Sequence, residues 1–138
     1  MHRAYLLIVT ALSEAGTGLI ALVSPGLLLR LLLGVDQASP ETDVCARIAG
    51  AALLAIGVAC WFGRSEAAGS ARHGLLASVL IYDVAAAVIL AYTGWFLNLV
   101  GILLWPAVLL HAALESGSTD QQVLAGILGS TEGFQKWS

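Results

Sequence analysis

The chain has 138 residues, of which 59% are hydrophobic and only 11% are charged, and its mean hydropathy is +0.89. A soluble domain carries about 25% charged residues, so this composition indicates a membrane protein. The net charge is −3 and the chain has six Lys and Arg residues. Nucleic-acid binding is therefore excluded, because it requires clustered cations.

Four apolar segments are long enough to cross a hydrocarbon core, which takes about 20 helical residues. They cover residues 4–23, 44–62, 75–92 and 97–114. Their apolar runs are continuous, whereas strands of a membrane barrel alternate, so we expect helices. Short connections make consecutive helices antiparallel. The sequence therefore predicts an all-α membrane protein, a four-transmembrane-helix bundle with up-down-up-down topology over residues 1–115.

Two local signals lie between the first two spans. The run GLLLRLLLG, residues 26–34, is too short to cross the membrane and carries Arg30 among its leucines. We expect a short interfacial helix there, with the Arg30 guanidinium reaching toward headgroups. Ser39, Pro40 and Glu41 form a helix start, because Ser39 can cap and Pro40 suits the first helical position.

The composition changes after Leu114, where residues 116–138 become polar with one apolar run. Ser118 and Gln121 have the spacing of a capping box. Four apolar residues then fall on one helical face: Val123, Leu124, Ile127 and Leu128. With Phe134 and Trp137 following, we expect an amphipathic tail that lies on the membrane surface or docks on a partner.

Ionisable side chains at membrane depth are costly and indicate a functional site. Glu14 and Asp83 lie near the middle of their spans, and His111 lies in the fourth. Helical direction and spacing bring these three side chains toward one interior polar site. Three hydroxyl residues share the helical face of Glu14: Thr10, Ser13 and Thr17. The site is interpreted as interhelical hydrogen bonding, a proton or cation pathway, or a binding site for a cationic or polar ligand.

Other candidate features are few. Pro106 lies in the middle of the fourth span, where we expect a helix kink. Ala107 and His111 have the A-x-x-x-H spacing that resembles the pigment-ligating histidine of light-harvesting polypeptides. His111 is thus the only candidate ligand for haem or (bacterio)chlorophyll, but we predict no cofactor and no metal. Cys45 and Cys60 lie too far apart on one helix to pair.

The first half of the chain resembles small uncharacterised bacterial integral membrane proteins with four spans. The matching features are a first helix that ends at Pro25, a leucine run that closes on Leu33 and Gly34, and a small-residue pattern in the second span. That pattern is Ala46-Arg47-x-x-Gly50-x-x-Leu53-Leu54-x-x-Gly57. The resemblance implies a four-span fold and no particular activity.

The sequence predicts an integral protein of the bacterial inner membrane with both termini in the cytoplasm. Three cationic residues lie on the side of the termini, Arg3, Arg64 and Arg72, against two on the other. No catalytic motif is present, so we expect no enzyme. The expected function is an accessory or assembly subunit of a larger membrane complex, which contacts other subunits through the tail and small-residue helix faces. The alternative is a small proton-coupled transporter or channel that uses the buried carboxyls, alone or as a homo-oligomer.

Overall fold

The computed structural model describes residues 2–67 and 69–118, and these residues form five α-helices. The helices are α1 (His2–Val23), α2 (Pro25–Leu33), α3 (Pro40–Gly63), α4 (Ser70–Phe96) and α5 (Leu104–Ser118). Three of them, α1, α3 and α4, contain stretches long and apolar enough to cross a membrane. The described residues therefore confirm the predicted all-α class. The first three predicted spans are confirmed as helices long and apolar enough to cross a membrane.

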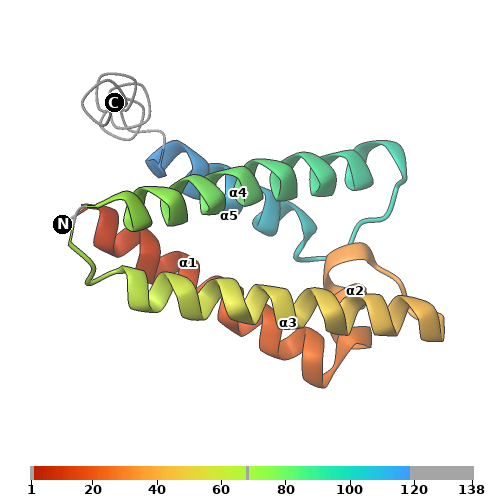
Figure 1. The fold of residues 1–138 in the computed structure, drawn as a ribbon. Helices are drawn as coiled ribbons and strands as arrows, with labels where there is room; N and C mark the ends of the chain where they lie inside the picture. The colour runs from red at the N-terminus through yellow and green to blue at the C-terminus, as the bar shows by residue number, and fades with distance from the viewer. Residues whose placement is uncertain (1, 68, 119–138) are drawn as a thin grey trace, which may run out of the picture.

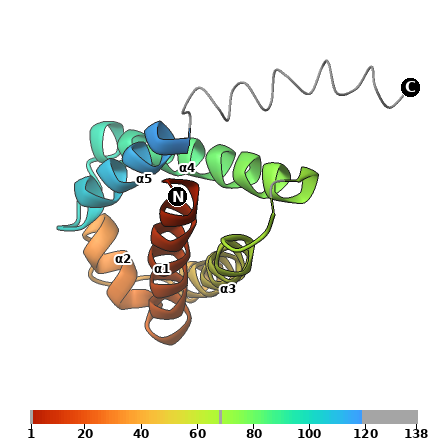
Figure 2. The ribbon, with the colours of Figure 1, turned by 90° about the vertical axis from the view of Figure 1, so that its left-hand side faces the viewer.

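The helices form two layers (Figure 1). Figures 1 and 2 both place α4 and α5 in one layer and α1 and α3 in the other. Helices α1 and α4 run in one direction, whereas α3 and α5 run in the other, so α5 ends near the start of α1 (Figure 1). Within each layer the two helices pack closely, and contacts between the layers are sparser.

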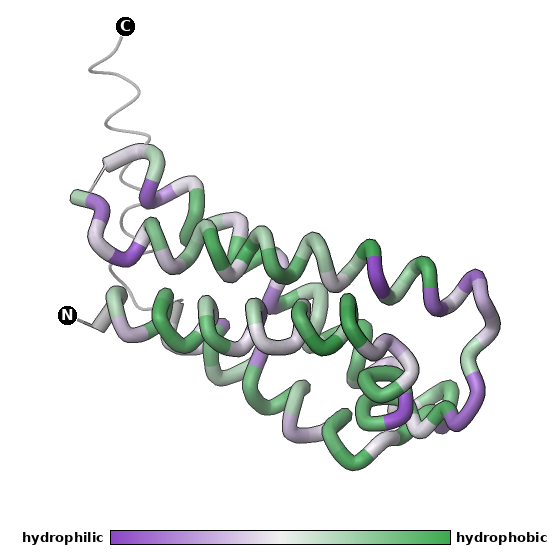
Figure 3. The backbone as a smooth tube through the Cα atoms, turned by 90° about the horizontal axis from the view of Figure 1, so that it is seen from below, coloured by the Kyte–Doolittle hydropathy of each residue, from purple (hydrophilic) through white to green (hydrophobic). Residues whose placement is uncertain are grey.

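The surface is unlike that of a soluble protein, because large apolar side chains cover it. Large apolar side chains are exposed on every long helix, among them Leu12, Ile48 and Ile81. In contrast, four polar residues are buried: Thr10, Glu14, Asp83 and His111. In Figure 3 the middle parts of the long helices are mainly hydrophobic. An apolar exterior with the ionisable residues of the spans inside is typical of helical membrane proteins.

Glycine allows α1 and α3 to approach closely. A Cβ atom added to Gly18 would lie 2.6 Å from the carbonyl oxygen of Gly50, and one added to Gly57 would lie 2.8 Å from the backbone nitrogen of Ala15. Small residues allow such backbone contact between membrane helices. The small-residue face of α3 around Gly50 and Gly57 is therefore used inside this chain.

Two predictions for the connection between the first spans are confirmed: residues 26–33 lie in a short helix, and Ser39 caps the start of the next helix. Helix α3 begins at Pro40, and the Thr42 N–H group donates to Ser39 Oγ at 3.3 Å. Helix α2 ends at Leu33 and is capped by Gly34, which has a φ of 68° and donates its N–H to the Arg30 carbonyl. Arg30 also forms an exposed ion pair with Asp36, at 3.3 Å.

The predicted fourth span is wrong as a single helix over residues 97–114. Helix α4 continues to Phe96, residues 97–103 are not helical, and α5 begins only at Leu104. The break contains Asn98, whose φ of 52° is left-handed. Gly101 N–H and Leu103 N–H donate to the carbonyls of Leu32 and Leu31, at 2.9 and 2.8 Å. These carbonyls lie in the last turn of α2, where they have no intrahelical donor. They therefore accept from backbone N–H groups that lack a partner because residues 97–103 are not helical.

Pro106 does not lie in the middle of a helix, where the kink was predicted. Pro106 lies in the first turn of α5, where a backbone N–H group has no intrahelical acceptor. Proline is therefore accommodated at the start of this helix. Helix α5 extends to Ser118, and the remaining tail, including the expected amphipathic face from Val123 to Leu128, lies outside the described residues.

Candidate functional site

Three helices bring together the ionisable residues that the sequence singled out. Glu14 comes from α1, Asp83 from α4 and His111 from α5. One carboxylate oxygen of each acid and one ring nitrogen of His111 all lie within 4.8 Å of one another. The side chains are buried, with exposed fractions of 3% for Glu14, 0% for Asp83 and 9% for His111.

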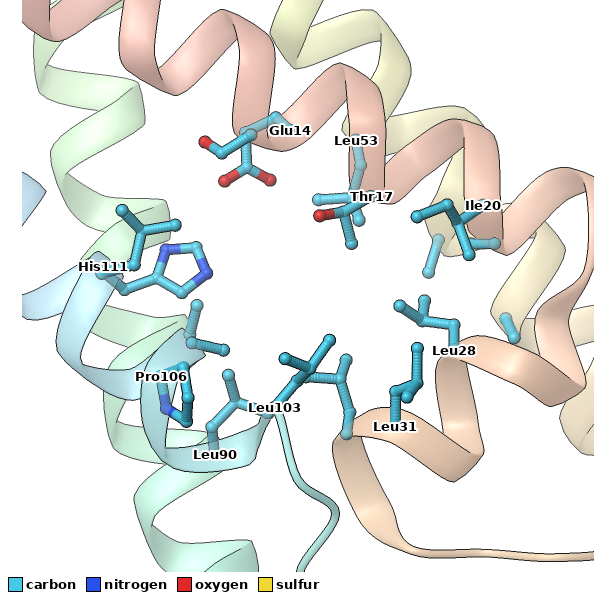
Figure 4. Close-up of a pocket in the computed structure, with 18 of the residues that line it drawn as sticks. Glu14, Thr17, Ile20, Leu28, Leu31, Leu53, Leu90, Leu103, Pro106 and His111 are labelled. Atoms are coloured by element: carbon cyan, nitrogen blue, oxygen red, sulfur yellow. The ribbon is translucent and has the colours of Figure 1, made fainter.

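Asp83 positions the His111 imidazole. His111 Nδ1–H donates to Asp83 Oδ1 at 2.8 Å, and the Tyr82 ring meets the imidazole edge-on at a centroid distance of 5.7 Å. This hydrogen bond leaves the second ring nitrogen, Nε2, directed into the cavity (Figure 4). A carboxylate that binds one nitrogen of a histidine fixes the ring for work at the other nitrogen. The other oxygen, Asp83 Oδ2, is buried and has no hydrogen-bond partner among the described residues.

Tyr82 is a member of this site that the sequence did not reveal. Its hydroxyl interacts with the Glu14 carboxyl. It precedes Asp83 directly in α4, so helical spacing places it about 100° around the helix from that residue. Its position next to Asp83 is the only signal in the sequence, because a tyrosine inside a membrane helix is uncharged and resembles the other aromatic residues of the spans.

The hydroxyl residues on the face of Glu14 have two environments. Thr10 is buried, with an exposed fraction of 2%. Ser13 and Thr17 are half-buried and line the cavity, and Ser13 Oγ donates to the Thr10 carbonyl at 3.1 Å. These three hydroxyl residues therefore extend the polar site along α1.

A cavity of about 510 Å³ begins at this polar group. Figure 4 shows Glu14 and His111 on one side of it and the leucines of α2 on the other. Its lining is mostly apolar and comes from all five helices and the connection before α5, including Ile20, Leu28, Leu31, Leu53, Ala86, Leu90 and Leu103. Pockets of roughly 300 to 1,000 Å³ with few polar groups are typical of sites for small ligands.

On its other side the polar group borders a packed apolar core. That core consists of Leu7, Ala11, Cys60, Leu76 and Val79. All five are buried. The cluster of Glu14, Asp83 and His111 therefore lies between this packed core and the cavity.

The same three residues offer donor atoms that a metal ion uses. Ligands of a tetrahedral Zn²⁺ lie about 3.4 Å from each other, given metal–ligand distances near 2.1 Å. The donor atoms here lie up to 4.8 Å apart, so they would have to move together to bind one ion. Pigment ligation by His111 would compete with the Tyr82 ring beside it. The absence of a metal and a cofactor stays a prediction.

Comparisons with protein-family models, with curated proteins and with solved structures found no match to this chain. The resemblance to small four-span bacterial proteins therefore stays a prediction.

Proposed function

We propose that this protein binds a small, largely apolar molecule inside the bilayer and holds the molecule's polar group at Glu14, Tyr82 and His111. The observation that carries the proposal is the apolar cavity of about 510 Å³ with these three side chains at one end. The walls of such a cavity favour ligands with an apolar body, and its few polar groups fix the orientation of the bound ligand.

The proposed setting is a four-span bundle in the bacterial inner membrane, with both termini in the cytoplasm. Helix α5 has 15 residues, which alone reach about 22 Å. Together with residues 97–103, whose backbone is hydrogen-bonded to α2, α5 would complete a fourth crossing. Non-helical backbone is tolerated at membrane depth where protein satisfies its polar groups.

The test is to identify what the cavity retains. The protein is transferred from its native membrane into lipid nanodiscs, and the bound small molecules are extracted and identified by mass spectrometry. Ala86 lines the cavity, whereas its neighbour Ala85 is exposed on the same helix. We expect the wild type and Ala85→Phe to retain one apolar molecule that Ala86→Phe loses. Equal retention by the two variants, or no molecule enriched over Ala86→Phe, would contradict the proposal.

Proton-coupled transport is a second candidate, because the titratable groups lie between the two helix layers at the end of the cavity. A carrier of this kind would lose proton coupling in Glu14→Gln, since the amide keeps the size of the side chain but does not titrate. Proton uptake by proteoliposomes under an imposed substrate gradient measures this. The accessory-subunit function and the absence of catalysis stay predictions, because they depend on partners and on the tail.

A further inference from the structure

The charges around the cavity are unbalanced. The polar group contains two carboxyl groups and one imidazole, and no Lys or Arg belongs to the described residues that line the cavity. The imidazole is already hydrogen-bonded to Asp83. Glu14 forms no ion pair with any described Lys, Arg or His residue, although its exposed fraction is 3%.

This imbalance restricts the polar group of a ligand. A buried charge is tolerated when it is paired, and placing a second charge of the same sign beside it is costly. A carboxylate or phosphate in the cavity would face Glu14 with no Lys or Arg among the described lining residues to oppose it. A positively charged group would meet the Glu14 carboxyl, which has no ion-pair partner among the described residues.

We propose that the ligand is an amphipathic amine, whose protonated nitrogen pairs with the Glu14 carboxylate while its apolar body fills the cavity. This inference rests on the proposed function and names the ligand class for the same site. The Nε2 atom of His111 faces the cavity (Figure 4). With Nδ1–H bound to Asp83, Nε2 would accept a second hydrogen bond from the amine nitrogen. The Tyr82 hydroxyl supports Glu14 from the α4 side.

The apolar volume distinguishes an amine from a metal ion. A bare cation would use only the donor atoms of Glu14, Asp83 and His111, which lie up to 4.8 Å apart, and would leave about 510 Å³ of apolar space unfilled. An organic cation uses both parts of the site.

Three probes with the same apolar cage test the class of the polar group: 1-aminoadamantane, 1-adamantanol and adamantane-1-carboxylate. Their dissociation constants are measured by titration calorimetry on the full chain in nanodiscs, with empty nanodiscs subtracted. Glu14→Gln removes the charge, Glu14→Asp keeps it, and Glu66→Gln is the matched control because Glu66 is exposed outside the cavity. Circular dichroism checks that each variant keeps its helices.

We expect the amine to bind the wild type and Glu66→Gln equally and Glu14→Gln at least about tenfold more weakly, as loss of a charge-assisted hydrogen bond implies. Glu14→Asp should retain the preference for the amine. The alcohol should bind the wild type and Glu14→Gln alike, and the carboxylate should bind most weakly.

Two results would overturn the amine and leave the cavity in place. In the first, the amine and the alcohol bind the wild type equally. In the second, the amine binds the wild type and Glu14→Gln equally. In both, Ala86→Phe abolishes binding. Zinc chloride binding that Glu14→Gln removes, without Glu14-dependent amine binding, would assign the three donors to a metal ion instead. If none of the probes binds the wild type better than Ala86→Phe, the amine and the proposed function both fail.

Discussion

Asp83 is the residue on which the geometry of the site depends. It is fully buried, and one of its oxygens accepts from His111 while the other has no partner among the described residues. Without Asp83 the imidazole would lose the interaction that directs Nε2 into the cavity.

Asp83→Ala should therefore reduce the free energy of unfolding by about 0.6 to 1.7 kcal/mol, from the average to the largest value found for side-chain hydrogen bonds between membrane helices. Asp83→Asn should cost less, because its amide oxygen still accepts from His111 Nδ1–H. Equilibrium unfolding in mixed micelles measures both variants. A silent Asp83→Ala would show that the imidazole is held by packing alone.

The residues of the site were largely accessible from the sequence, because an ionisable residue in an apolar run is conspicuous. Helical spacing and span direction were sufficient to group Glu14, Asp83 and His111, which the structure places within 4.8 Å. Tyr82 was missed because a phenol carries no charge at neutral pH and differs little from the other aromatic residues of the spans. The cavity was not predictable, since its volume depends on how the layers are spaced.

At the scale of helices, the contact between α1 and α3 depends on glycine at the points of closest approach. Gly18 lies against backbone atoms of α3, whereas a Cβ atom at Gly16, on the same helix, would meet nothing within 4 Å. These two glycines therefore form a matched pair with opposite expectations.

Gly18→Ala should reduce stability by about 1 to 3 kcal/mol, the usual cost of overpacking. Gly16→Ala should raise stability by up to about 1 kcal/mol, because alanine restricts the unfolded chain and favours a helix. Thermal unfolding of the two variants in one detergent compares them directly. Destabilisation of similar size in both would mean that α1 and α3 do not approach as closely as the structure shows.

The connection between α4 and α5 shows what hydropathy could not predict. Residues 97–114 are apolar throughout except at Asn98 and His111, so a window average treats them as one span. Asn98, Gly101 and Pro106 were the available signals of a break. The acceptors that make the break tolerable belong to α2, about 70 residues earlier in the chain, and no local pattern specifies such pairing.

Gly101→Ala should disrupt this connection, because the added Cβ would lie 2.1 Å from the Leu31 carbonyl oxygen. We expect a loss of about 1 to 3 kcal/mol and faster amide exchange at Leu103. Gly26→Ala, in the first turn of α2 with nothing within 4 Å, is the control and should leave exchange at Leu103 unchanged. Similar exchange in both variants would show that residues 97–103 are not docked on α2.

For the whole molecule, the alternating helix directions make a prediction about membrane topology. The connection that holds Asp36 and the end of α5 lie at opposite ends of the bundle (Figure 1). Reporter fusions at Asp36 and Ser138 should therefore report opposite sides of the membrane, with Ser138 in the cytoplasm. The same side for both would show that α5 with residues 97–103 does not cross.

The docking of residues 97–103 on α2 also has a consequence for the biogenesis of the protein. In hydrocarbon, each unsatisfied backbone N–H group costs several kcal/mol, and those of Gly101 and Leu103 find their acceptors on α2. A ribosome completes α2 well before it reaches the last segment, so the acceptors exist before the donors arrive. Helix α2 would then help the last segment to insert, because it supplies the backbone acceptors that this segment needs. A nascent chain without residues 25–33 would release its last segment from the translocon less efficiently into the bilayer.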